Sequence, residues 1–68
     1  MNLHSEQEPF RGTLTGRTPE NEYTTLIITR RNRRVWITFD GSVRTTITMT
    51  DQDTTQLVSL LQEAQSHS

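Results

Sequence analysis

The sequence predicts an α+β domain, an antiparallel meander of three to four strands followed by one C-terminal amphipathic helix. Thirteen threonines, most of them between residues 23 and 55, favour a sheet because β-branched side chains fit a pleated surface. Two reversal signals, one around Asn32 and one at Asp40-Gly41, separate strand-like segments. Leucines at helical spacing follow the last of these segments.

The first element in the chain is the segment 10–16. Phe10 and Leu14 fall on one side of its alternating pattern, and Arg11 and Thr13 fall on the other. Whether this segment forms a strand decides between three strands and four. A turn is expected next, because residues 18–21 read Thr-Pro-Glu-Asn.

The central hairpin joins residues 23–29 to residues 35–39. We expect its turn at Arg31-Asn32, because this reversal sets apolar residues of the two strands opposite each other. One face then forms the core and the other faces outward. The expected core pairs are Ile28 with Val35, Leu26 with Ile37 and Thr24 with Phe39, and the expected outer pairs are Ile27 with Trp36, Thr25 with Thr38 and Tyr23 with Asp40.

Residues 43–49 alternate apolar and polar side chains and predict the last strand. A two-residue Asp-Gly turn before it would set Phe39 opposite Ser42, an apolar residue against a polar one. We therefore expect a loop with an odd number of residues and a bulge at Gly41.

Thr50 predicts the start of the helix. Its hydroxyl can cap the free amides, and Asp51 and Asp53 favour the positive end of the helix dipole. We expect this helix to lie across the inner face of the sheet. The apolar helix positions are Leu57, Leu60, Leu61 and Ala64, and the sheet residues they would shield are Leu26, Ile28, Val35, Ile37, Phe39, Val43 and Ile47.

The 68 residues predict one domain, residues 10–65, with a disordered tail at 1–9 and a frayed tail at 66–68. A chain this short buries only about 60% of its unfolded surface. Without cysteines it has no disulfide, so we expect a homodimer. The absence of cysteine, of a signal sequence and of an apolar run of about 18 residues predicts a cytoplasmic protein with no membrane association.

Catalytic chemistry is not indicated. His4 and His67 fall in the presumed tails without a second ligand at metal-binding spacing. Asp51 and Asp53 are explained as helix-capping carboxylates. No glycine-rich phosphate loop precedes the helix. We therefore expect no enzymatic activity, no metal and no cofactor.

Charge is concentrated in the middle of the chain. Residues 23–49 carry five arginines and one aspartate, a net charge of +4 between acidic ends. The run Arg30-Arg31-Asn32-Arg33-Arg34 is interpreted as a hairpin tip that is only solvated, docks on an acidic protein surface, or binds nucleic-acid phosphates with Trp36 or Tyr23 stacking on a base. The overall charge of −1 counts against nucleic acid.

The second candidate surface is the outer sheet face around Trp36. Either the segment around Phe10 and Leu14 folds over this face, or the face is an interface, because Trp, Tyr and Arg are typical of binding hot spots. The predicted partner-binding residues are Arg30, Arg31, Arg33, Arg34, Trp36, Ile27, Tyr23 and Arg44.

The segment 35–42, Val-Trp-Ile-Thr-Phe-Asp-Gly-Ser, with the strand end 47–50 and the helix 57–64, resembles small uncharacterised actinobacterial and phage-borne proteins. The order of elements also resembles the whirly-type transcription cofactors, although the lysine-rich strands of that family are missing. In that family a four-stranded meander is followed by one dimerising helix, and the sheet binds single strands. For this chain the resemblance implies the topology and a dimer more than a nucleic-acid site.

These observations predict a small, non-enzymatic binding protein. Our first hypothesis is that it docks on another cellular protein with an acidic surface, through the arginine tip and the aromatic face, and regulates or inhibits that protein. The alternative is a single-stranded nucleic-acid-binding module.

Overall fold

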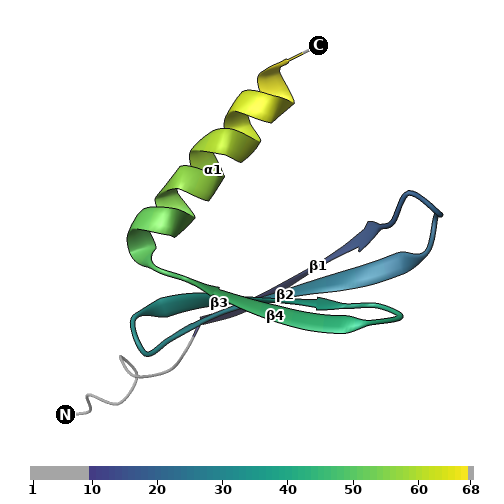
Figure 1. The fold of residues 1–68 in the computed structure, drawn as a ribbon, viewed down its shortest axis with the longest axis horizontal. Helices are drawn as coiled ribbons and strands as arrows, with labels where there is room; N and C mark the ends of the chain where they lie inside the picture. Colours follow the sequence, from purple (N-terminus) through teal and green to yellow (C-terminus); the bar gives the residue numbers. More distant parts are fainter. Residues whose placement is uncertain (1–9, 68) are drawn as a thin grey trace.

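The computed structural model describes residues 10–67, which form one four-stranded antiparallel sheet and one helix (Figure 1). Each strand pairs with its neighbour in sequence, so the predicted meander followed by a C-terminal helix is confirmed. The residues 10–16 belong to a full strand. The predicted tail at 1–9 lies outside the described residues. The elements are β1 (Phe10–Arg17), β2 (Tyr23–Arg31), β3 (Arg34–Asp40), β4 (Arg44–Met49) and α1 (Asp51–Ser66).

The strand register gives the sheet two chemically different faces. Residues directly opposite each other in an antiparallel pair lie on the same face, so the pairs can be followed across all four strands. The apolar face consists of Phe10, Gly12, Leu14, Gly16, Thr24, Leu26, Ile28, Arg30, Val35, Ile37, Phe39, Thr45, Ile47 and Met49. The arginine–threonine face consists of Arg11, Thr13, Thr15, Arg17, Tyr23, Thr25, Ile27, Thr29, Arg31, Arg34, Trp36, Thr38, Asp40, Arg44, Thr46 and Thr48.

The first strand extends the sheet at its edge. Phe10 and Leu14 lie on the apolar face, on the opposite side of the sheet from Trp36. The alternative in which this segment folds over Trp36 is therefore wrong. Gly12 allows the Phe10 ring to bend over β1, since a Cβ at residue 12 would lie 3.2 Å from the ring.

The turn of the central hairpin is Asn32-Arg33, one residue later than predicted. Both residues have a positive φ, 54° and 63°, as a two-residue type I′ turn requires. The expected Arg31-Asn32 turn and its pairings are therefore wrong. Moving the turn by one residue changes the pairing of the strands by two residues. Because side chains alternate between the two faces along a strand, every residue keeps its predicted face. The observed pairs are Leu26 with Phe39, Ile28 with Ile37, Arg30 with Val35, Thr25 with Asp40, Ile27 with Thr38 and Thr29 with Trp36.

The β3–β4 connection has three residues, 41–43, and the predicted odd loop is confirmed. Gly41 does not have the positive φ of a left-handed bulge residue. A Cβ at this position would lie 2.7 Å from the Thr24 hydroxyl oxygen, so glycine permits the close approach of the loop to β2. Val43 lies in the loop, where it is 72% exposed, and not in the strand.

The predicted helix cap is confirmed. The Thr50 hydroxyl accepts a hydrogen bond from the Asp53 backbone N–H at 3.1 Å. The Thr54 hydroxyl donates to the Thr50 carbonyl at 2.8 Å and closes the same turn. At the other end, the His67 N–H donates to the Ala64 carbonyl.

The position of α1 differs from the prediction. The helix projects from the sheet instead of lying across its apolar face (Figure 1), and its backbone approaches only β3 and β4 among the described strands. No residue of α1, all of which is described, is buried. Between residues 10 and 67, only Ile37 and Thr38 are buried. The molecule is therefore a single-layered sheet whose own helix does not cover it.

Candidate functional site

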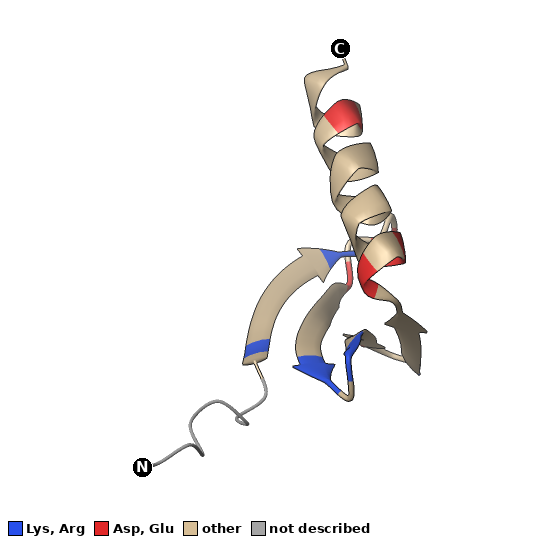
Figure 2. Cartoon of the chain, turned by 90° about the vertical axis from the view of Figure 1, so that its left-hand side faces the viewer, with Lys and Arg blue, Asp and Glu red and all other residues tan. Residues whose placement is uncertain are grey.

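The positive charge of the described chain is concentrated on the arginine–threonine face. Five arginines and one aspartate lie on it, which gives a local charge of +4 in a chain whose net charge is −1. Along the chain, Figure 2 marks only acidic residues on the helix, whereas the basic residues lie in the sheet and its hairpin end. The other described acidic residues are Glu20 and Glu22 in the β1–β2 loop and Asp51, Asp53 and Glu63 in α1.

At the hairpin end of this face, Arg31 covers the indole ring of Trp36. The guanidinium carbon lies 4.5 Å from the ring centroid, a cation–π distance. The Trp36 Nε1–H also donates to the Arg31 carbonyl at 3.4 Å. Arg34 pairs directly with Arg31 across the hairpin, and Arg33 occupies the turn. Three of the four predicted tip arginines therefore lie together.

Arg30, the fourth of these arginines, lies on the opposite side of the sheet. Its guanidinium donates to both carboxylate oxygens of Asp51, at 2.5 and 3.1 Å. The hydrogen bond from Arg30 lowers the pKa of the Asp51 carboxyl, and the same bond raises the pKa of Arg30. Arg30 therefore connects β2 to the first turn of α1.

Tyr23 lies at the far end of the same face. The Arg17 guanidinium donates to the Tyr23 hydroxyl at 2.8 Å and lies 4.7 Å from its ring centroid. A second bond from Arg17 reaches the Asn21 side-chain oxygen at 2.8 Å. Trp36 pairs with Thr29, six residues along β2 from Tyr23 and hence about 20 Å away. Tyr23 and Trp36 are therefore not part of one aromatic cluster.

Between these ends the face contains an open hollow of about 310 Å³. Arg11, Arg31 and Arg44, from three different strands, contribute to its lining. Arg44 also forms an ion pair with Asp40 at 3.5 Å. The remaining lining residues are Phe10, Ile27, Thr29 and Thr38. Each of these arginines can form charge-assisted hydrogen bonds with a phosphate or carboxylate group.

Threonine hydroxyls form most of the remaining surface of this face. The side-chain oxygens of Thr38 and Thr46 lie 2.9 Å apart and share a hydrogen bond across β3 and β4. Further threonines follow in rows along the strands, and each hydroxyl can donate to a phosphate or sugar oxygen.

Arg11 and Arg17 are not among the predicted binding residues, although both lie on the arginine–threonine face. The signal was present, because both residues alternate with Phe10 and Leu14 in the first strand. The missing information was the pairing of β1 with β2, which places Arg11 opposite Thr29 and thereby on the face of Trp36.

Within residues 10–67, no helix is long and apolar enough to cross a membrane. No protein-family model matches the chain, and neither a curated protein nor a solved structure is significantly similar to it. The resemblances to small actinobacterial and phage-borne proteins and to whirly-type cofactors stay predictions.

Proposed function

We propose that this chain acts by binding and not by catalysis, and that its arginine–threonine face binds single-stranded nucleic acid. The observation that supports this most is the presence of five arginines on one open sheet face, with at least one on every strand. Proteins that bind single strands without sequence preference use cationic surfaces that follow the phosphates, together with flat side chains that stack on bases.

The acidic net charge of the chain does not oppose this proposal. The acidic residues of the β1–β2 loop and of α1 lie off the arginine–threonine face, on which Asp40 is the one acidic residue between positions 10 and 67. A strand bound on this face therefore meets a positive local field.

The composition of the face favours nucleic acid over protein. Arginine and threonine dominate it, and its large apolar or aromatic side chains are Ile27, Trp36 and Tyr23. Nucleic-acid interfaces are more polar and more positively charged than protein–protein interfaces, whose centres are depleted of charge. Arg33 also fits this proposal, because it occupies a left-handed turn position at which glycine would be less strained.

Docking on an acidic protein is the second candidate function. The observation that favours it is that Arg31 lies over the Trp36 ring and Arg17 over the Tyr23 ring, so one face of each ring is already occupied. A base would stack on such a ring only after the guanidinium moves. Arg and Trp side chains are, in contrast, typical hot-spot residues of protein interfaces.

A salt titration with labelled oligonucleotides tests the proposal. If about four phosphates are contacted, log K should fall with log salt concentration with a slope of about −3 for a single strand. Single-stranded DNA, single-stranded RNA and duplex DNA should be compared. Polyglutamate is the competitor that represents an acidic protein surface, and strong competition by it would support the second candidate.

Arg30 and Arg31 provide a matched pair of variants. Arg31→Ser should weaken oligonucleotide binding and reduce the steepness of the salt slope by about 0.7. Arg30→Ser removes the same charge from the apolar face and should change affinity by less than about twofold, because a charge on the far side contacts no phosphate. Absence of binding at about 50 mM salt, or equal losses in both variants, would contradict nucleic-acid binding.

A further inference from the structure

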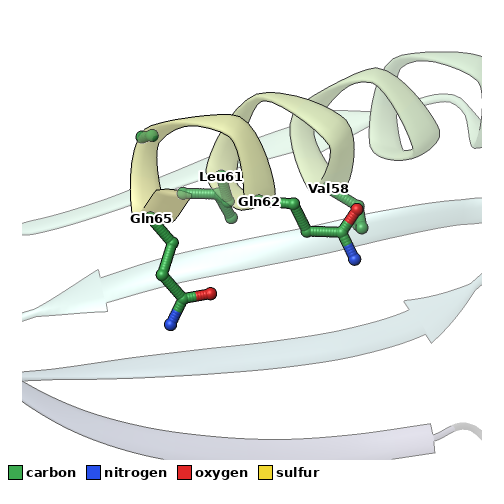
Figure 3. A pocket seen from close by; sticks show the side chains of 5 residues that line it. Val58, Leu61, Gln62 and Gln65 are labelled. Carbon is green, nitrogen blue, oxygen red and sulfur yellow. The ribbon is translucent and has the colours of Figure 1, made fainter. Parts of the chain in front are cut away.

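The apolar surface of α1 is exposed. Val58, Leu60 and Leu61 are 46%, 55% and 60% exposed, and Leu57 in the preceding turn is half-buried. A hollow on this surface is lined by Val58, Leu61, Gln62, Ala64 and Gln65 (Figure 3). In this view the labelled side chains project from one side of the helix. Apolar residues at this spacing form a stripe that normally faces a core.

The apolar face of the sheet is equally open. Phe10 and Leu14 on β1 are 62% and 63% exposed, Phe39 on β3 is 38% exposed and Ile47 on β4 is 43% exposed. The one charged residue on this face within residues 10–67 is Arg30, which is already paired with Asp51. A stable domain needs a second layer against such a face.

The helix is held away from its own sheet. Thr50 alone separates the end of β4 from the start of α1, whereas connections that reverse the chain usually have two to six residues. The bidentate Arg30–Asp51 pair links the first turn of α1 to β2 in this orientation. The radius of gyration, 14.6 Å, exceeds the value of about 10 Å expected for a compact chain of the described length.

We propose that a second copy of the chain supplies the missing layer, and that two copies exchange helices. The α1 stripe of each protomer packs on the apolar sheet face of the other, in a two-fold symmetric dimer. The dimensions agree, because a helix of 16 residues is about 24 Å long and strands of six to nine residues span about 20 to 30 Å. Both arginine–threonine faces remain exposed, so the dimer does not depend on the proposed function.

The apolar area that this dimer would bury is also sufficient for a stable interface. Four sheet residues and three helix residues expose large apolar side chains, each of which would remove roughly 100 Å² from water. The resulting area, about 700 Å² for each protomer, approaches the figure of about 800 Å² for each partner in a stable protein interface. A face-to-face pair of sheets would bury the sheet residues but leave both helix stripes exposed.

Sedimentation equilibrium of the unmodified chain tests the association. A mass near 15.8 kDa, twice 7.9 kDa, is expected at micromolar concentration. A mass of 7.9 kDa at high concentration would overturn the proposal.

Cross-linking tests the exchange of helices. The chain has no cysteine, so Ile47→Cys and Leu61→Cys can each be made in separately tagged copies, mixed, and treated with a short bismaleimide. Both positions are exposed within one chain, and circular dichroism verifies that each variant folds. The cross-linked product that joins the sheet of one tagged copy to the helix of the other should form in at least tenfold higher yield than the product of the control pair, Thr46→Cys and Ser59→Cys. Of these control positions, Thr46 lies on the arginine–threonine face, and Ser59 lies on the side of α1 opposite its apolar stripe.

Two cross-linking results would overturn the exchange. One is a dominant product between two Ile47→Cys copies, which would indicate sheets packed face to face. The other is a product within a single chain when both cysteines are placed in one copy, which would show that α1 folds back on its own sheet.

Discussion

Arg30 and Arg31 are neighbours in β2, but strand alternation sends their side chains to opposite faces. Arg31 lies along the Trp36 ring on the arginine–threonine face, and Arg30 pairs with Asp51 in the helix. Strand alternation predicts this division, but the contacts of Arg31 with Trp36 and of Arg30 with Asp51 cannot be read from a run of arginines. The helix cap is different, because Thr50 and Asp53 are three residues apart and their contact is local enough to be predicted.

The Arg30–Asp51 pair predicts a pH dependence of stability. Because the pKa of Asp51 is lower in the folded chain, the pair stabilises the fold above the unfolded value of about 4, and this stabilisation is lost as the pH falls through the lower folded value. Comparing the free energies of unfolding of Asp51→Asn and the parent chain from pH 7 to pH 2 should show a difference that shrinks below about pH 4.

Asp53→Asn is the control for this experiment. It removes a carboxylate from the same helical turn but no ion pair among the described residues. If both variants show the same pH profile, the helix dipole and not the Arg30 contact is responsible.

Ile37 and Leu60 should respond differently to truncation. Ile37 is 7% exposed at the centre of the sheet, so Ile37→Ala should cost about 2 to 4 kcal/mol. Leu60 is 55% exposed within one chain, and Leu60→Ala should cost less than about 0.5 kcal/mol at dilute concentration. If the helices are exchanged, the cost of Leu60→Ala should rise with protein concentration. Denaturant midpoints at two concentrations measure this, and a large cost at both would mean that α1 packs on its own sheet.

At the scale of elements, the strands, the reversals and the helix follow from alternation, turn residues and spacing. The hairpin register does not, because no glycine marks the turn, and both Arg31-Asn32 and Asn32-Arg33 keep the same residues on the same face. The turn in the structure is Asn32-Arg33, and Arg33 has a φ of 63°. The face of each residue could therefore be predicted, and its direct partner could not.

The left-handed Arg33 predicts that glycine is better for folding at this position. Arg33→Gly should stabilise the chain by about 0.5 to 1 kcal/mol, since Asn-Gly is the preferred pair in a type I′ turn. Thermal or denaturant unfolding provides the measurement. Oligonucleotide affinity should fall in the same variant, and a loss of stability would indicate that the Arg33 side chain makes an important contact.

The hairpin tip as a whole should contribute to binding more than to stability. Replacing Arg31, Arg33 and Arg34 together by serine should change the free energy of unfolding by less than about 1 kcal/mol, because exposed charges contribute little. Oligonucleotide affinity at low salt should fall at least tenfold, about 1.4 kcal/mol, with a salt slope shallower by about 2. If the affinity is unchanged, the tip contributes only to solubility. The binding site is then restricted to the hollow around Arg11 and Arg44.

At the scale of the whole molecule, the position of α1 could not be predicted from the sequence. The spacing of Leu57, Leu60 and Leu61 identifies an apolar stripe but does not say which sheet it covers. The one-residue connection at Thr50 and the pair between Arg30 and Asp51 together direct the helix away from its own sheet. The result is a chain whose apolar surfaces and basic face are both exposed.

Nuclear magnetic resonance of the arginine side chains, during titration with a single-stranded oligonucleotide at low salt, tests the role of the basic face most directly. All seven basic residues are arginines, so each Nε–H group is a reporter of its own position. The Nε–H signals of Arg11, Arg31 and Arg44 should shift together with the Trp36 indole signal, whereas the Arg30 signal should stay in place. Shifts centred on Arg30 and the α1 amides, or no shifts at all, would contradict nucleic-acid binding by the arginine–threonine face.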